Sequence, residues 1–221
     1  MSEPENFIAR WSRRKRNAAE DADATKVPAT LGQAGERADK SEQESDPGSE
    51  RAVDQRAKQD ALAVQAAAAG DRRLVVAGSE EVAKLARRWG VEVLLEPRQE
   101  GQNVAAARGI ARAVEGGAEA VLLLSSDLPL VTIDAVREVL DWASRIDVPV
   151  AVAVAAIGRG GTNALYLRPP GAITLHFGSD SLAKFRHEAE SRGVNFAVHV
   201  SEAMSLDLDE PGDLARLRRA G

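Results

Sequence analysis

The apolar run at residues 120–124 constrains the fold more than any other stretch of this chain. It shows no alternation with polar residues, which is typical of a strand buried on both faces within a helix-covered parallel sheet. Pro129 cannot donate a hydrogen bond to a neighbouring strand and favours an extended Leu128, so Asp127 should lie where the strand passes into a loop. Open α/β sheets bind ligands at that edge. Asp127 is therefore either a ligand-binding carboxylate or a turn residue that bonds its own backbone.

Strand and helix patterns alternate from residue 71 onward. Apolar strand patterns at 74–76, 91–95, 121–124 and 148–155 are separated by helical patterns at 79–88, 103–114 and 132–144. Ser79 and Thr132 are suitable N-caps for two of these helices. Further strands are predicted at 164–167, 195–200 and 206–209, with helices at 179–191 and 210–219. The alternation predicts βαβ units and a largely parallel sheet, in an α/β domain spanning residues 71–221.

The first 70 residues have a different composition, with few large apolar side chains among many Ala, Glu, Asp, Gln, Arg and Ser residues. Such a segment cannot bury enough surface to offset its conformational entropy. We therefore expect a disordered tail at residues 1–60 and a helical linker at residues 61–70. A short amphipathic helix within the tail, with Phe7, Ile8 and Trp11 on one face, either docks on a protein partner or an anionic membrane surface, or stays solvated. Residues 1–20 resemble an uncharacterised bacterial family that suggests no activity.

Composition narrows the classes of function. The net charge of −5 leaves no strong basic field, so we expect no nucleic-acid partner. The chain has no cysteine, which excludes disulfides and thiolate metal sites and fits a cytoplasmic protein. Its longest apolar run, residues 148–157, is too short to span a bilayer, and no secretory signal is visible. A homodimer is compatible with these features.

Two aspartates near the C-terminus form a candidate metal site. Residues two apart in a strand point the same way, so Leu206 and Leu208 can face the core while Asp207 and Asp209 face outward together. Paired carboxylates suit Mg²⁺, which usually takes one or two of them and completes its shell with water and phosphates. In the alternative interpretation Asp209 is a helix N-cap and Asp207 is a solvated surface residue.

Two glycine-containing stretches are candidate anion sites. The run at residues 158–163 combines glycines with the hydroxyl of Thr162, and glycines allow backbone N–H groups to approach an anion closely. The stretch at residues 177–181 places Gly178 and serines at a predicted helix N-terminus, where anions are stabilised. A tight turn and a plain N-cap, respectively, are the competing interpretations.

The order and joint spacing of these motifs are more specific than any one of them. The chain carries, in order, Gly101 with Asn103, Ser126-Asp127-Leu128-Pro129-Leu130, Gly161-Thr162-Asn163-Ala164-Leu165, Phe177-Gly178-Ser179-Asp180-Ser181 and Leu206-Asp207-Leu208-Asp209. Over residues 72–217 this series resembles the 2-phospho-L-lactate guanylyltransferase family. The resemblance implies a Rossmann-like, GT-A-like nucleotidyltransferase fold, a three-layer α/β sandwich.

The resemblance also implies an activity and a site. GTP and a phosphorylated three-carbon acid (2-phospholactate, phosphoenolpyruvate or 3-phosphoglycerate) would be joined with release of pyrophosphate, in biosynthesis of the deazaflavin coenzyme F-420. By matching position, the metal-binding catalytic residues would be Asp127, Asp207 and Asp209, which would hold Mg²⁺. The phospho-acid would be bound by Thr162, Gly178 and Ser181, and the nucleotide by Gly101 and Asn103.

One part of the family pattern has no counterpart in this sequence. Nothing before Leu74 supplies the family's first strand and its cationic nucleotide-binding loop, so we expect a domain without that strand. Two alternative hypotheses follow. The chain could be a catalytically inactive homologue that acts as a binding module, or a related nucleotidyltransferase of the molybdopterin cofactor type.

Overall fold

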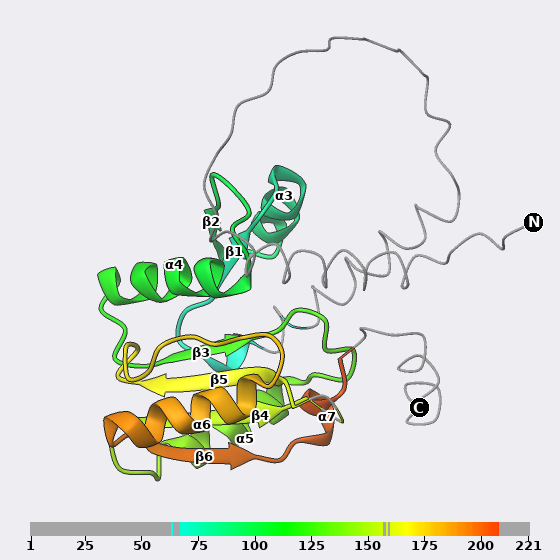
Figure 1. Cartoon of the computed structure of the whole chain (residues 1–221). Coiled ribbons are helices and arrows are strands. Elements are labelled where there is room, and N and C mark those ends of the chain that lie inside the picture. The colour runs from blue at the N-terminus through cyan, green and yellow to red at the C-terminus, as the bar shows by residue number, and fades with distance from the viewer. Residues whose placement is uncertain (1–62, 64–66, 157, 159, 208–221) are drawn as a thin grey trace, which may run out of the picture.

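The computed structural model describes residues 63, 67–156, 158 and 160–207 (Figure 1). The predictions for residues 1–60, for Asp209 and for the helix at 210–219 lie outside this part. In order, its elements are η1 (Ala67–Ala69), β1 (Leu74–Ala77), α3 (Glu80–Arg88), β2 (Glu92–Leu95), α4 (Gln102–Glu115), β3 (Val121–Leu124), α5 (Ile133–Ala143), β4 (Val150–Ala155), β5 (Thr162–Arg168), α6 (Ser181–Arg192), β6 (Asn195–His199) and α7 (Glu202–Ser205).

In the described part of the chain, the main sheet has four strands in the order β3-β5-β4-β6. β4 pairs with β6 in parallel, but β5 runs antiparallel to both β3 and β4. β3, β4 and β6 thus run in one direction, and the prediction of a largely parallel sheet is wrong for β5. The reason is the connection: β5 follows β4 after residues 156–161 with no crossover helix, and a connection this short joins antiparallel strands.

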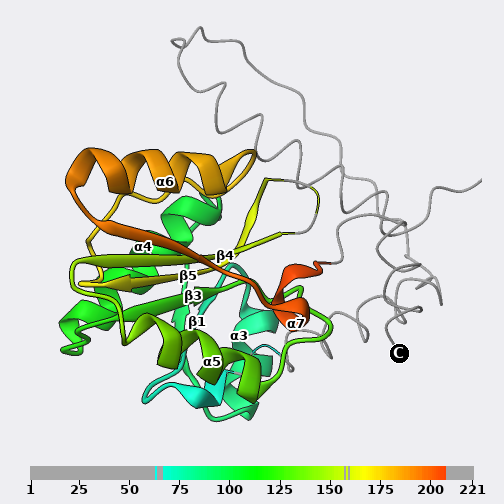
Figure 2. The same cartoon turned by 90° about the horizontal axis from the view of Figure 1, so that it is seen from below.

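Helices cover both faces of this sheet, which gives three layers (Figure 2). Val152 and Val154 of β4 point to the side of α5, while Ala151 and Ala153 point to the side of α6. This is the alternation expected of successive residues in a strand that is covered on both sides. All four residues are buried, as is Phe185 at the centre of the α6 side. The core is thus built around β4 and β5.

Among the described strands, β3 is the first of the four-stranded sheet and does not lie at its centre. Leu122 and Leu124 contact the core on the α5 side, and Val121 and Leu123 contact the core on the α6 side. None of the four is fully buried, because β5 is the one strand paired with β3 in the described part of the chain. The prediction of a strand is confirmed, but the prediction of complete burial on both faces is wrong.

A second, two-stranded parallel sheet holds β1 and β2. Among the described residues no strand joins it to β3. The absence of the family's first strand from this domain stays a prediction, because residues 1–62 lie outside that part. α4 contacts both β1 and β3 and so connects the two sheets. No residue of α4 is fully buried, and Val104 and Val114 are exposed. This half of the domain is packed less completely than the half around β4 and β5.

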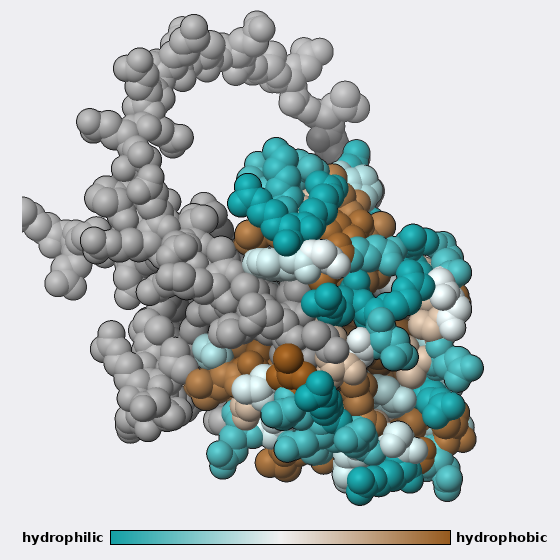
Figure 3. Space-filling view, turned by 180° about the vertical axis from the view of Figure 1, so that it is seen from behind, coloured by the Kyte–Doolittle hydropathy of each residue, from teal (hydrophilic) through white to brown (hydrophobic). Residues whose placement is uncertain are grey.

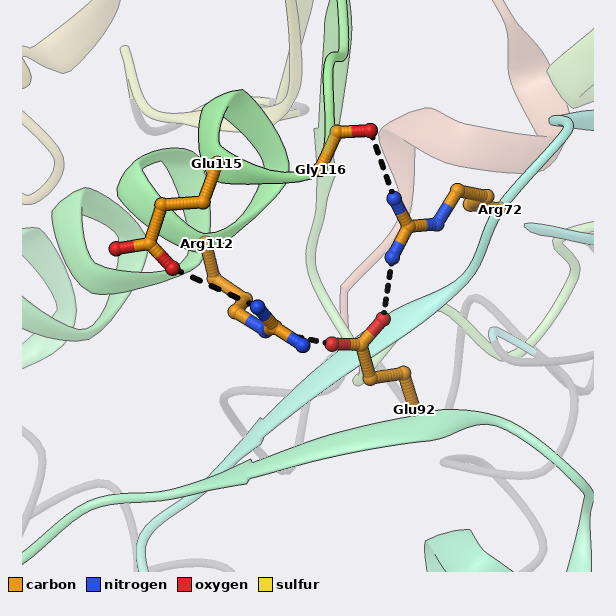
Figure 4. A network of polar contacts seen from close by, with 5 residues as sticks. All are labelled: Arg72, Glu92, Arg112, Glu115 and Gly116. Atoms are coloured by element: carbon orange, nitrogen blue, oxygen red, sulfur yellow. Dashed lines mark hydrogen bonds and ion pairs between the residues drawn. The ribbon is translucent and has the colours of Figure 1, made fainter.

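Charged side chains fasten the two-stranded sheet to the C-terminal end of α4 (Figure 4). Glu92 accepts a hydrogen bond of 2.8 Å from Arg72 and one of 2.7 Å from Arg112. Arg72 also donates to the carbonyl of Gly116 at 3.0 Å. The hydrogen bonds from Arg72 and then Arg112 lower the pKa of Glu92 below its ordinary value. Because the two arginines are well exposed and Glu92 is partly exposed, the network fixes orientation more than it adds stability.

The predicted helix ends are largely confirmed. Ser79 accepts the N–H of Val82 at the start of α3, and Thr132 accepts the N–H of Ala135 at the start of α5. α6 begins at Ser181, later than the predicted position 179. No helix in the described part is long and apolar enough to cross a bilayer. Seen from behind, hydrophilic and apolar areas are interspersed over the surface (Figure 3).

Candidate functional site

Three of the predicted motifs lie at one edge of the four-stranded sheet, where β3 and β4 end and β5 begins. β3 and β4 run in the same direction and β5 in the opposite one, so the ends of β3 and β4 and the start of β5 lie together. Asp127 lies in the loop that follows β3, as predicted, and Thr162 is the first residue of β5. Asp207 follows α7, whose residue Met204 is hydrogen-bonded to this edge by Asn163. The fold therefore assembles these motifs from distant parts of the sequence.

Asn163 lies at the centre of this edge. Its backbone carbonyl accepts the N–H of Ser125 at 2.9 Å, just before Asp127. Its side-chain Nδ2 donates to the backbone carbonyl of Met204 at 3.0 Å, just before Asp207. Asn163 is only 4% exposed, so both bonds are shielded from solvent. One residue thus joins the two segments that carry the predicted metal-binding aspartates.

Apolar packing reinforces this arrangement. Leu128, next to Asp127, and Met204, close to Asp207, are both fully buried in one cluster that also contains Ala164 of β5. Since a well-packed core tolerates little displacement, the cluster restricts how far the two segments can move apart.

The environment of Asp207 differs from the predicted one. Residues 206–207 are not in a strand, and both Leu206 and Asp207 are buried, with Asp207 8% exposed. The prediction that Asp207 faces outward, opposite Leu206, is therefore wrong. The short helix α7 turns the chain immediately before these residues, so the alternation of an extended strand does not apply.

Thr162 and Ser181 are brought into direct contact. The Ser181 hydroxyl donates to Oγ1 of Thr162 at 3.0 Å, and both residues are buried, with 0% and 7% of their surface exposed. The N–H of Leu182 donates to the carbonyl of Gly160 at 3.1 Å, which seats the first turn of α6 on the β4–β5 connection. The two stretches predicted as separate anion sites thus form one structure.

The turn before α6 has unusual backbone geometry. Gly178 has a φ of 120°, which L-residues with a side chain rarely adopt, and its carbonyl accepts the N–H of Ser181 at 3.2 Å. Asp180 has a φ of 55° and is the one non-glycine residue with positive φ in the described part. Aspartate tolerates the left-handed region better than most residues, because its short polar side chain can hydrogen-bond locally. Asp180, not Ser179, is the N-cap, and it makes no side-chain capping bond.

The residues predicted to bind the nucleotide lie at the start of α4. Gly101 is its N-cap with a φ of 93°. The side-chain amide of Asn103 accepts the N–H of Phe177 at 2.7 Å and donates to the carbonyl of Phe177 at 3.1 Å. Asn103 therefore ties α4 to the residue that precedes Gly178. The nucleotide-binding role of both residues stays a prediction.

The donor atoms suit the predicted Mg²⁺. Among the described residues no group of three His, Cys, Asp or Glu side chains is placed to hold a metal ion. Asp127 and Asp207 supply two carboxylates on segments that Asn163 joins, and the third predicted ligand, Asp209, lies outside that part. One or two carboxylates are what protein sites for Mg²⁺ commonly provide, so the oxygen donors fit this ion.

Sequence reasoning missed the roles of Asn163 and Asp180. Asn163 belongs to the motif at residues 161–165, but its hydrogen bond to Met204 joins residues 41 positions apart, which no local pattern reveals. The signal that could have pointed to it is an amide side chain at the start of an otherwise apolar strand, since a buried amide needs hydrogen-bond partners. Asp180 carries no signal beyond its tolerance of the left-handed region.

The family of this chain is identified by a match to one family model. The family model described as "Guanylyl transferase CofC like" matches residues 43–220. The chain belongs to this family. The match begins well before β1 and earlier than residue 72, where the resemblance in the sequence motifs begins.

Curated relatives in this guanylyl transferase family are named for three different acceptor acids. The phosphoenolpyruvate guanylyltransferase of Rubrobacter xylanophilus is 43% identical over 156 residues, which cover 69% of this chain and 74% of that protein. The 2-phospho-L-lactate guanylyltransferase of Methanothermobacter thermautotrophicus is 36% identical, over 66% of this chain and 63% of that protein. The 3-phospho-D-glycerate guanylyltransferase of Phenylobacterium zucineum is 35% identical, over 72% of each chain.

Solved structures confirm the predicted fold class. A nucleotidyl transferase from Methanothermobacter aligns with a TM-score of 0.56 at 20% identity, over 75% of this chain and 79% of that one. A 4-diphosphocytidyl-2C-methyl-D-erythritol synthase aligns with a TM-score of 0.55 at 16% identity, over 74% and 88% of the two chains. At these identities the likeness shows the fold alone: this family member has a nucleotidyltransferase fold.

Proposed function

We propose that this protein transfers the guanylyl group of GTP to the phosphate of a phosphorylated three-carbon acid, in biosynthesis of coenzyme F-420. An oxygen of the acceptor phosphate attacks the α-phosphorus of GTP, the bond from that phosphorus to the α–β bridging oxygen breaks, and pyrophosphate leaves. The observation that carries the proposal is the convergence of Asp127, Thr162 and Asp207 on one sheet edge around Asn163, in a chain of the guanylyl transferase family.

Thr162, Gly178 and Ser181 are proposed to bind the acid. The two hydroxyls already contact each other at the start of α6, where the helix dipole favours a negative charge. Each hydroxyl has more than one hydrogen-bonding position, so the bond between them leaves capacity for an acceptor. Gly178 adds backbone that can approach a phosphate or carboxylate closely because it has no Cβ.

Asp127, Asp207 and Asp209 are proposed to hold Mg²⁺. The ion would screen the charge of the triphosphate and of the leaving pyrophosphate. The contribution of the protein is positional: it holds the two carboxylate segments in register with the acid subsite, through Asn163 and the cluster of Leu128 and Met204. Phosphoryl-type transfer depends largely on such alignment and on charge stabilisation, so no protein nucleophile is needed.

The relatives differ in the acid they are named for, so the acceptor must be measured. Purified protein is incubated with GTP, Mg²⁺ and, separately, 2-phospholactate, phosphoenolpyruvate and 3-phosphoglycerate, and pyrophosphate is quantified. We expect release with one of the three acids. A folded sample that releases none with any acid would refute the proposed reaction.

Replacement of Asp127 tests the carboxylate. Asp127→Asn keeps the shape of the side chain and removes its charge, so we expect loss of Mg²⁺-dependent GTP binding, measured by calorimetry. Asp134→Asn, at the exposed start of α5, is the matched control and should bind Mg-GTP as the wild type does. Unchanged binding in Asp127→Asn would mean that Asp127 is a turn residue.

One observation favours a second candidate, a binding module that has lost turnover. Nothing before Leu74 in the sequence matches the family's first strand and cationic nucleotide-binding loop, although the proposed reaction needs nucleotide and acid to be held in line. Tight Mg-GTP binding without pyrophosphate release from any acid would support this candidate over the enzyme.

A further inference from the structure

We propose that Asn163 is a positioning residue that places Asp207 for metal binding, separately from the acid subsite. The inference rests on the proposed function and extends it. Asn163 is 4% exposed, and its amide reaches across from β5 to the backbone of α7. Neither the family resemblance nor the relatives' names assign it a role.

The two bonds of Asn163 have different chemical origins. Its carbonyl bonds to the N–H of Ser125 as an extension of the β3–β5 pairing, which continues from Leu124 and Ala164. This bond is made by the backbone and survives replacement of the side chain. The bond to Met204 is made by the side chain alone. A substitution at Asn163 therefore removes one hydrogen bond that positions the segment of Asp207 and keeps the backbone bond that positions the segment of Asp127.

The carbonyl of Met204 explains why an amide is needed. Carbonyl groups in the last turn of a helix have no partner within the helix, and α7 is so short that Met204 lies in that turn. The buried acceptor needs a donor of the right length without a negative charge. Asparagine provides one. Leucine has a similar size but no donor, and the hydroxyl of serine is too short to bridge the same gap.

Thr162 precedes Asn163 in β5 and belongs to the other subsite. Its hydroxyl contact with Ser181 does not involve the Asn163 side chain. The geometry therefore separates two effects that a general loss of structure would produce together: weaker metal binding and weaker acid binding.

The test measures Mn²⁺ binding to the full chain by calorimetry without substrate, with Mn²⁺ as the probe of the Mg²⁺ site. The variants are Asn163→Leu and Asn163→Ser, and the acceptor KM is measured for each. Loss of a residue that orients metal ligands typically lowers affinity about 10–100-fold, and we expect a loss of this size with little change in acceptor KM. Asn163→Ser, which leaves room for water, keeps the test valid if Asn163→Leu fails to fold.

Asn195→Leu is the matched control. Asn195 also donates from Nδ2 to a backbone carbonyl, that of Asp147 at 2.8 Å, but it lies at the start of β6, at the opposite edge of the sheet. Its loss should leave Mn²⁺ affinity unchanged.

The outcomes separate the inference from the proposed function. Wild-type-like Mn²⁺ affinity in a folded Asn163→Ser variant overturns the role of Asn163 alone. An equal loss of metal and acid binding overturns it as well, because that pattern indicates general disruption. A folded wild type that binds Mn²⁺ but releases no pyrophosphate refutes the proposed reaction and leaves the inference standing. A wild type that binds no Mn²⁺ overturns the inference, and pyrophosphate release then decides the proposed reaction by itself.

Discussion

Removing either hydroxyl of the Thr162–Ser181 pair should destabilise the protein more than removing both. The two residues are buried and joined by one hydrogen bond of 3.0 Å. Thr162→Val keeps the shape of the side chain but leaves the Ser181 hydroxyl without its acceptor. Ser181→Ala leaves Oγ1 of Thr162 without its donor. In the double variant both polar groups are gone, so no unpaired hydroxyl remains buried at this position.

The magnitude follows from the cost of an unsatisfied buried polar group. Each single variant should lose about 1–3 kcal/mol of unfolding free energy, whereas replacing both partners by apolar groups can be nearly neutral. For a chain of this size about 2 kcal/mol corresponds to a fall in Tm of roughly 4–8 °C. The double variant should therefore unfold at a higher temperature than either single variant.

The same variants separate stability from acid binding. A hydrogen bond from a hydroxyl to a charged phosphate contributes about 1.5–3 kcal/mol, so loss of both hydroxyls should raise the acceptor KM more than tenfold. Thermal unfolding gives the first quantity, and pyrophosphate release against acceptor concentration gives the second. The double variant should recover stability without recovering acceptor binding.

Two results would refute this reasoning. If the double variant regains both stability and acceptor KM, the hydroxyls serve packing and the acid binds elsewhere. If neither single variant loses stability, the pair is not shielded from water as its burial indicates.

Three further changes test other parts of the molecule. Asn103→Ala removes the hydrogen bonds between Asn103 and Phe177, which should weaken acceptor binding by about 1 kcal/mol and so raise the acceptor KM a few-fold. An unchanged acceptor KM would exclude a role for these bonds. Phe185→Ala empties a fully buried site, so urea denaturation should show a loss of about 3–5 kcal/mol, and less than 1 kcal/mol would contradict the packing. The pKa of Glu92 is lowered in the folded state, chiefly by Arg72, so its stabilising contribution is present above its ordinary value of 4.5 and is lost as pH falls through the folded value. The Tm difference between wild type and Glu92→Gln should accordingly narrow below that pH, and a constant difference would refute the assignment.

Local chemistry made much of the secondary structure predictable. Ser79 and Thr132 cap their helices because a short side-chain oxygen reaches an N–H group in the first turn, an interaction within a few residues. The apolar runs around Val121 and Val150 form strands because their residues suit a surface covered on both sides. These features depend on neighbours in sequence.

Features that depend on neighbours in space were not predictable in the same way. β5 was expected in a largely parallel sheet, but the direct connection from β4 reverses the chain. The glycines of that connection are equally compatible with an anion-binding loop, so they did not reveal the reversal. The partial burial of β3 depends on how many strands flank it, which its own residues do not encode. Asp207 is buried because α7 redirects the chain.

The candidate site shows the same division. Its residues could be named in advance because their order matches a family, but their contacts could not. Asn103 and Phe177 are 74 positions apart, and Asn163 and Met204 are 41 positions apart. Each contact uses a side-chain amide bonded to a backbone group, and backbone groups carry no sequence identity that would identify the partner. Such bonds can be found only after the fold has placed the two segments together.

α4 is the element through which the two halves of the proposed site must be aligned. Its C-terminal end is held to the two-stranded sheet by Arg112 with Glu92 and by Gly116 with Arg72. Its N-terminal end is held to the acid-side loop by Asn103. α4 also packs against β1 and β3, so these contacts contribute to the relative position of the two sheets. A change at Asn103 should therefore act on substrate alignment, whereas a change at Glu92 should act first on the attachment of the two-stranded sheet.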